Sequence, residues 1–220
     1  AMALRDGPAG PIPAKDVLKL GAVGAVPPSL GVVEGGKIPY KPEALAIKKE
    51  NQLHWLERDP EIKCYLPGVP RATYIPQPFQ IFQGDDSIFI TYQYAGADRD
   101  IFMKDPGPAP VDSWMGQSVA RWEGDTLVID VTGQNASTWF DRAGNHHSEQ
   151  LHVEERYTMT SPNHMQYEAT ITDPLTFTKP WKISMPLYRR MEPNVQILDF
   201  KCVEFVEELL YGDLRAKPLD

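Results

Sequence analysis

The stretch SVARWEGDTLVIDVT, from Ser118 to Thr132, carries two β-strand patterns separated by the turn dipeptide Gly124-Asp125. Apolar and polar side chains alternate on each side of the turn, which predicts a hairpin of strands 118–123 and 126–132. The tight turn sets three cross-strand pairs: Trp122 with Leu127, Ala120 with Ile129, and Ser118 with Val131. These pairs share one largely apolar side of the hairpin, so we expect that side to face a hydrophobic core.

Strand patterns of the same kind continue before and after this hairpin. Runs of β-branched and aromatic residues alternate with turns that contain Gly, Asp or Pro. These runs cover residues 79–82, 87–94, 100–104, 150–158, 165–172, 181–188 and 196–205. About nine short strands at regular spacing predict a mainly β protein, built as an antiparallel up-and-down barrel or as a strongly curved, lipocalin-like sheet.

The two ends of the chain differ in character from the strand region. Residues 1–41 are rich in Gly and Pro and show no periodicity, so we expect an extended arm there rather than a domain. A helix is expected near residues 42–57, with Pro42 in its first turn, and a second short helix at 204–217. Residues 42–220 then form a single β domain with one or two short flanking helices.

The charge balance excludes some classes of partner. The 220 residues include 22 Lys and Arg against 30 Asp and Glu, a formal net charge of −8, and no long basic stretch offsets it. A phosphate backbone or an anionic membrane surface requires clustered basic residues, so we expect no nucleic acid and no membrane partner. No apolar run approaches the ~20 residues of a membrane span. The oligomeric state is open, and a homo-oligomer is one alternative.

The two cysteines, Cys64 and Cys202, lie 138 positions apart, which is not the spacing of a metal-binding CxxC pair. One alternative is a pair of buried free thiols, a common environment for unpaired cysteine. The other is a disulfide that closes a long loop and stabilises the fold by roughly 3–5 kcal/mol in the loop-entropy treatment. A disulfide would indicate an oxidising compartment.

Several short motifs follow one another in a distinctive order. They include PGVPR at 67–71, PFQI at 78–81, WMGQS at 114–118, RWEGDTLVID at 121–130, TWFD at 138–141 and HSEQLH at 147–152. In these motifs the chain resembles a large family of uncharacterised exported bacterial proteins, of the type found in Acidobacteria and Proteobacteria. The resemblance covers residues 60–205. Members of that family usually have a His where this chain has Gln117, so any role of that His would be missing here.

The resemblance has two implications. Its members generally carry both cysteines, which favours the disulfide between Cys64 and Cys202. They typically begin with signal peptides, which implies a periplasmic or secreted protein. The resemblance implies no reaction, because none is known to us as common to the family.

The candidate catalytic residues are Asp141, His147, Glu149 and His152. Three of the five histidines of the chain fall within seven residues, 146–152, and His is the side chain best suited to proton transfer near neutral pH. A neighbouring carboxylate, Glu149 or Asp141, could orient His147. In a strand, residues 147 and 152 point to opposite faces, so one metal held by both requires a bend or bulge between them. The remaining alternative is that these histidines have structural roles.

The candidate substrate-binding residues are Arg121, Asp130, Trp114, Trp139 and Tyr92. If the face of the hairpin that carries Arg121 lines a barrel interior, its guanidinium could hold a polar group of a substrate. If that face is in solvent, Arg121 and Asp130 form a surface ion pair of little energetic weight. The aromatic residues are either core residues or the walls of a pocket for an apolar or phenolic ligand.

These residues lead to a first functional hypothesis and three alternatives. The first is a cofactor-free acid/base enzyme, a lyase, isomerase or hydratase, acting on a small apolar or aromatic molecule in a β-barrel pocket. The alternatives are a non-catalytic periplasmic small-ligand-binding protein, a metal-dependent enzyme that uses the His cluster, and a structural envelope protein with a filled barrel. The environment of His147 separates the first two, because an enzyme requires its ring to open into a cavity beside a carboxylate.

Overall fold

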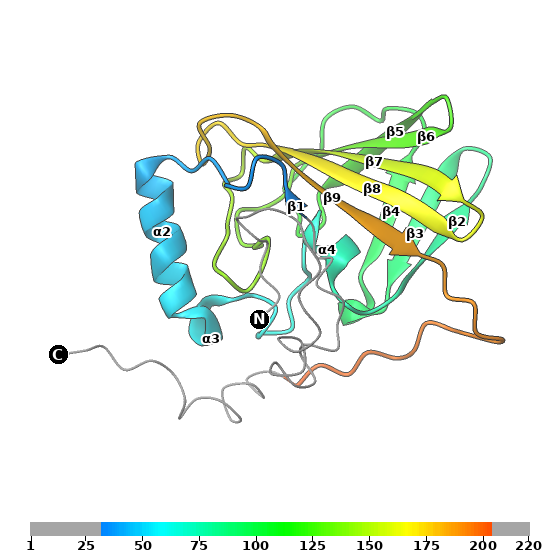
Figure 1. Ribbon diagram of the computed structural model, residues 1–220, viewed down its shortest axis with the longest axis horizontal. Helices are drawn as coiled ribbons and strands as arrows, with labels where there is room; N and C mark the ends of the chain where they lie inside the picture. The colour runs from blue at the N-terminus through cyan, green and yellow to red at the C-terminus, as the bar shows by residue number, and fades with distance from the viewer. Residues whose placement is uncertain (1–31, 204–220) are drawn as a thin grey trace.

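A single nine-stranded sheet dominates the computed structural model, which describes residues 32–203 (Figure 1). The strands are β1 (Val32–Val33), β2 (Phe79–Gln83), β3 (Ser87–Tyr92), β4 (Asp98–Phe102), β5 (Gln117–Glu123), β6 (Thr126–Thr132), β7 (His152–Ser161), β8 (His164–Thr172) and β9 (Trp181–Tyr188). Their order is β1-β9-β8-β7-β6-β5-β4-β3-β2, and β4 with β5 is the one parallel pair of this sheet. The sheet curls strongly into a half-barrel, so the predicted curved, lipocalin-like sheet is confirmed.

The hairpin predicted from residues 118–132 is present with the predicted register. Trp122 opposes Leu127, Ala120 opposes Ile129 and Ser118 opposes Val131. Gly124 occupies the turn at φ +60°, in the left-handed region that glycine adopts without steric cost. The inner side of the hairpin reaches the core through residues that are at most 5 % exposed, apart from the half-exposed Trp122 at the strand end.

The remaining strand predictions are confirmed with one exception. β2, β3, β4, β7, β8 and β9 each coincide with a predicted run to within a few residues. The strand predicted at 196–205 is wrong over its described part, because residues 196–203 form no strand. That segment instead lies against the turn after β3, where the Leu198 amide donates to Gln93 Oε1 at 3.3 Å and the Phe200 ring packs on Tyr94.

The edge of the sheet next to β9 is covered by residues that the sequence had assigned to the arm. Val32 and Val33 pair with Ser184 and Ile183, and Val33 is fully buried. The last part of the predicted arm therefore contributes a short strand to the sheet, and the division of the chain at residue 41 stays a prediction. The rest of the predicted arm, 1–31, and the predicted helix at 204–217 lie outside the described residues.

The helix predicted near 42–57 is present as α2 (Pro42–Leu53) followed by α3 (Trp55–Arg58). Figure 1 shows α2 standing apart from the sheet, with the long loop between β6 and β7 reaching towards it. The contact is close, because an added Cβ on Gly144 would lie 2.7 Å from the Gln52 nitrogen. Asn51 of α2 is buried there and donates to the Gly144 carbonyl at 3.5 Å.

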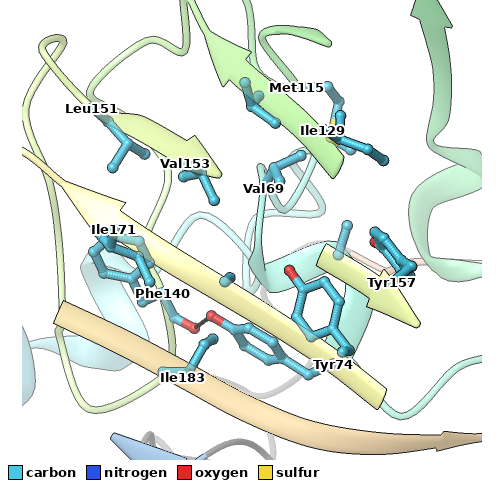
Figure 2. Close-up of a cluster of buried hydrophobic side chains, with 14 of the residues drawn as sticks. Val69, Tyr74, Met115, Ile129, Phe140, Leu151, Val153, Tyr157, Ile171 and Ile183 are labelled. Carbon is cyan, nitrogen blue, oxygen red and sulfur yellow. Dashed lines mark hydrogen bonds between the residues drawn. The ribbon is translucent and has the colours of Figure 1, made fainter. Parts of the chain in front are cut away.

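Two short elements were not predicted, α4 (Arg71–Tyr74) and the 3-10 turn η2 (Tyr94–Gly96). α4 lies at the inner side of the curled sheet, and its residues are all buried. Figure 2 shows Tyr74 reaching into the core formed by residues of β7, β8 and β9, where its hydroxyl donates to the Phe140 carbonyl at 2.8 Å. α4 therefore fills part of the half-barrel that the sheet alone would leave open.

Covalent and ionic contacts hold the irregular segment that leads into α4. Cys64 and Cys202 form a disulfide, so the alternative of two free thiols is wrong. The buried Arg71 guanidinium donates to both carboxylate oxygens of Asp59, at 2.8 and 3.0 Å, and to Glu61 at 2.5 Å.

No helix among residues 32–203 is long and apolar enough to cross a membrane.

Candidate functional site

A set of polar side chains lies inside the half-barrel, on an inner face that is otherwise mostly apolar. It consists of Thr73 (α4), Tyr92 (β3), Arg99 (β4), Ser118 (β5), Glu155 and Tyr157 (β7) and Tyr167 (β8). Each of these residues is at most 4 % exposed. We refer to this set as the interior polar cluster.

Glu155 is the centre of the interior polar cluster. Its carboxylate forms an ion pair with the Arg99 guanidinium through Nη2. The Tyr157 and Tyr167 hydroxyls both donate to Glu155 Oε1, at 3.1 and 2.7 Å, and Arg99 Nε donates to Ser118 Oγ at 2.7 Å. The buried carboxylate is thus both neutralised and hydrogen-bonded, which is the condition for keeping a charge in a protein interior.

The electrostatics of the interior polar cluster keep its phenols protonated. Burial and the negative charge of Glu155 raise the pKa of Tyr157 and of Tyr167 well above the ordinary value. Burial also raises the pKa of Tyr92, although the positive charge of Arg99 opposes this. For Arg99, burial acts to lower the pKa, but Glu155 outweighs it and the net shift is upward. The cluster therefore holds neutral phenol donors and one compensated ion pair.

Two hydrogen-bond donors of the interior polar cluster have no partner among residues 32–203. They are the Tyr92 hydroxyl and Arg99 Nη1, and both atoms are fully buried. Arg99 and the Thr73 hydroxyl act on the Tyr92 hydroxyl as hydrogen-bonding neighbours and lower its pKa in part, yet no contact among them is close and aligned enough to be a hydrogen bond. The two unpaired donors therefore lie in one neighbourhood. An unsatisfied buried polar atom costs about 1–3 kcal/mol. A group that accepts from both donors would remove that cost.

A groove of about 580 Å³ opens at one end of the half-barrel. Its apolar walls come from Phe79 and Ile81 of β2, Met159 of β7, Met165 of β8, Leu187 of β9, and Val195 and Ile197 of the segment after β9. β2 and β9 are seven places apart in the strand order, so their meeting in one groove is a direct result of the curl. We refer to this groove as the mouth groove.

The mouth groove adjoins the interior polar cluster. Phe79, in the groove wall, is the cross-strand partner of Tyr92, and their ring centroids are 5.5 Å apart. Met165, also in the wall, shares the inner face of β8 with Tyr167 two positions further on, a separation of roughly 6–7 Å along a strand. An apolar molecule in the groove would therefore lie one side chain away from the polar cluster.

The structure places His147 in a closed environment, with neither ring nitrogen bonded to a carboxylate. The residue is 4 % exposed, in the loop before β7. Its Nε2 contacts Thr138 Oγ1 at 2.6 Å and its Nδ1 contacts the Ser148 carbonyl at 2.8 Å, so both ring nitrogens are occupied within the protein. Burial lowers the pKa of His147, which favours the neutral ring. These contacts match the alternative in which this histidine has a structural role.

The other three residues of the predicted catalytic set are separated from His147. Glu149 is exposed. Asp141 is buried, but its carboxylate accepts from the Ala143 and Asn145 amides and from Asn145 Nδ2, and so it shapes its own loop. His152 lies on the outer face of β7, half exposed. The four residues are therefore not brought together into one site.

Arg121 and Asp130 lie on the solvent-facing side of the hairpin, not inside the half-barrel. They form an ion pair, and His152 Nε2 contacts the other oxygen of Asp130 at 2.9 Å. Their side chains are 48 % and 34 % exposed. Of the two alternatives left by the sequence, the structure therefore matches the surface ion pair.

The three aromatic candidates occupy different places. Trp114 is partly exposed and packs against Tyr65, with ring centroids 5.0 Å apart. Trp139 is buried and bridges to His146 in the loop between β6 and β7. Tyr92 alone lies in the half-barrel interior next to the mouth groove.

Metal binding by the histidine cluster has no geometric support in the described part of the chain. Among residues 32–203, no three side chains of His, Cys, Asp or Glu are close enough together to hold a metal ion. His147 and His152 each have the protein partners described above. The metal-dependent alternative therefore lacks a ligand set there.

The sequence analysis did not identify Arg99 and Glu155, although the alternation of their strands indicates that both are buried. Arg99 alternates in phase with the buried Ile101 of β4, and Glu155 alternates in phase with the buried Val153 of β7. A charge on the apolar phase of an alternating strand must be paired inside the fold. That argument identifies Arg99 and Glu155 individually, but not as partners, because β5 and β6 lie between their strands and the curl brings them together.

Comparison of the chain with protein-family models, with curated proteins and with solved structures found no match. The functional argument therefore depends on the geometry of the chain itself.

Proposed function

We propose that this protein binds a small, largely apolar molecule in the mouth groove, without catalysing its conversion. The observation that carries the proposal is a mainly apolar groove of about 580 Å³, with polar residues such as His164 and Asn163 in its lining, that adjoins a buried polar cluster with unpaired donors. Small-molecule sites combine apolar walls with a few fixed polar groups in this way, and their volumes are ~300–1,000 Å³. The half-barrel supplies apolar walls in the mouth groove and fixed polar groups in the interior polar cluster.

The geometry favours binding over the acid/base enzyme expected first from the sequence. That hypothesis required the His147 ring to open into a cavity beside a carboxylate, whereas both ring nitrogens contact Thr138 and Ser148. Burial raises the pKa of Tyr157 and of Tyr167, so these two interior phenols are not poised to exchange protons near neutral pH, and the Glu155 carboxylate is paired with Arg99. The mouth groove also argues against the structural-protein alternative, which expects no pocket.

The proposal also assigns the protein to an oxidising compartment. A disulfide between residues so far apart in sequence persists in the periplasm or outside the cell and is rare in the cytosol. Together with the resemblance to exported bacterial proteins, this supports a periplasmic or secreted ligand carrier or receptor.

The test is binding of N-phenyl-1-naphthylamine, a neutral apolar dye whose fluorescence rises in apolar sites. Wild-type protein should enhance the dye fluorescence in a saturable manner. Met159→Glu places a carboxylate in the groove wall at a residue that is 51 % exposed, so the fold should tolerate it. We expect roughly tenfold weaker binding, because the dye would have to desolvate that charge.

The matched control is Met191→Glu, at a methionine that is 65 % exposed and is not part of the groove wall. It changes net charge by the same amount and should leave dye binding unchanged. Absence of saturable binding to wild type, or equal loss in both variants, would contradict the proposal.

A further inference from the structure

We infer that the ligand carries a carbonyl group, and that Tyr92 and Arg99 bind its oxygen. This inference rests on the proposed function, because it assigns a chemical class to the molecule in the mouth groove. It is carried by the two buried, unpaired donors, the Tyr92 hydroxyl and Arg99 Nη1. The Tyr92 ring packs on Phe79 of the groove wall, with ring centroids 5.5 Å apart.

The donors define the type of group that they can bind. The hydroxyl of Tyr92 is a protonated phenol, because burial raises its pKa, and a guanidinium nitrogen can only donate. Both therefore call for an acceptor. A carbonyl oxygen has two lone pairs in one plane and can accept from two donors at once.

The charge balance of the interior polar cluster favours a neutral acceptor over a carboxylate. Arg99 is already neutralised by Glu155, and the carboxylate of Glu155 carries the hydrogen bonds of Tyr157 and Tyr167. An anionic ligand at Arg99 Nη1 would lie close to this second carboxylate in a poorly hydrated interior, where like charges repel strongly. A ketone, aldehyde or ester avoids that repulsion and still satisfies both donors.

The rim of the mouth groove does not change this charge balance. Arg190 forms an ion pair with Glu192 at 3.0 Å, and Arg189 is held at the groove by its backbone amide, which donates to the Asn163 carbonyl. Both arginines are exposed and follow β9. Since both are exposed, their charges would meet the solvent-facing end of a bound molecule.

The experiment compares three naphthalene probes of similar shape on the full chain with its disulfide intact. They are 2-acetylnaphthalene, 2-isopropenylnaphthalene, in which a methylene group replaces the oxygen, and 2-naphthoate. Wild type should bind the ketone about five- to tenfold more tightly than the alkene, the ratio expected for hydrogen bonds that replace unsatisfied donors. The naphthoate should bind more weakly than the ketone.

The decisive variant is Tyr92→Phe, which removes a hydroxyl that has no partner in residues 32–203 and so should not lower the Tm. It should abolish most of the preference for the ketone and leave alkene binding unchanged. The control, Tyr65→Phe, changes an exposed tyrosine outside the mouth groove and should retain the preference. As a second readout, the infrared carbonyl stretch of bound, 13C-labelled ketone should lie at lower frequency in wild type than in Tyr92→Phe.

The outcomes separate the inference from the proposed function. If the alkene binds and Met159→Glu weakens it, but the ketone binds no more tightly, the groove is a binding site and the carbonyl inference is wrong. Tighter binding of the naphthoate would also overturn the inference, since it would mean that Arg99 recognises an anion. If none of the probes binds, the proposed function fails and the inference fails with it, as expected for a groove occupied by another part of this chain or by a second copy.

Discussion

The substitution Arg99→Met tests whether the interior polar cluster is as buried and as tightly paired as the structure shows. The side chains of Arg99 and Glu155 are 1 % and 0 % exposed. Removing the guanidinium leaves the Glu155 carboxylate inside the half-barrel with the two tyrosine hydroxyls as its remaining partners. Met fills much of the same volume, so the loss of charge compensation should dominate the effect.

Breaking a buried pair in this way costs about 3–5 kcal/mol, out of a total stability of about 5–15 kcal/mol for a typical domain. Glu155→Gln should cost a similar amount, because it leaves Arg99 buried without a counter-charge. The double variant Arg99→Met/Glu155→Gln removes both charges, and the side-chain oxygen of the introduced glutamine can still accept from the two hydroxyls. Its loss should therefore be well below the sum of the two single losses, which corresponds to a coupling energy of several kcal/mol.

Urea denaturation followed by tryptophan fluorescence, with the disulfide intact, measures these free energies of unfolding. Arg121→Met is the matched control, since Arg121 also pairs with a carboxylate on a neighbouring strand but is 48 % exposed. Its cost should be below about 1 kcal/mol. A loss of less than about 1 kcal/mol for Arg99→Met, or additive losses in the double variant, would refute the reasoning, because it would mean that water reaches the pair.

Two further predictions concern the disulfide and the buried histidine. Cys202→Ser should lower the free energy of unfolding by up to about 5 kcal/mol, because it opens a loop of more than about 100 residues in the unfolded chain, and a urea titration that shows no loss would contradict this. Burial lowers the pKa of His147 and of His146, so the unfolded chain takes up protons first, and stability should decrease as the pH falls below about 6.5. His147→Gln should flatten that slope without removing it, and an unchanged slope in urea titrations at several pH values would exclude His147 as a contributor.

Local patterns were sufficient to predict most of the fold. The hairpin at 118–132 and six more strands follow from alternation and turn residues, which act over neighbouring positions. The failures involve interactions between distant segments. Residues 196–203 have strand-like composition, but they are tied to Gln93 and Cys64 instead of pairing with the sheet. The short strand Val32–Val33 is stabilised by β9, and nothing in its own sequence distinguishes it from the arm before it.

The candidate site was predicted less well, because clustering in sequence was taken for clustering in space. The residues Asp141, His147, Glu149 and His152 are adjacent in the chain, yet a loop followed by an alternating strand directs them to different environments. Tyr92 was chosen as an aromatic pocket residue, and it does adjoin the mouth groove. Its unpaired hydroxyl could not be inferred, since it depends on how the strands and α4 meet inside the half-barrel.

Three successive residues of β7 show why the interior polar cluster calls for a functional explanation. Glu154 and Arg156 point outward, where their charges remain partly hydrated and pair with each other and, for Glu154, with Arg121. Glu155 points inward and must lose its hydration to pair with Arg99. Apolar residues at both inner positions would stabilise a half-barrel at least as well, because a buried ion pair rarely repays its desolvation. A costly pair that also leaves two donors unsatisfied beside a groove is better explained by recognition of a ligand than by folding.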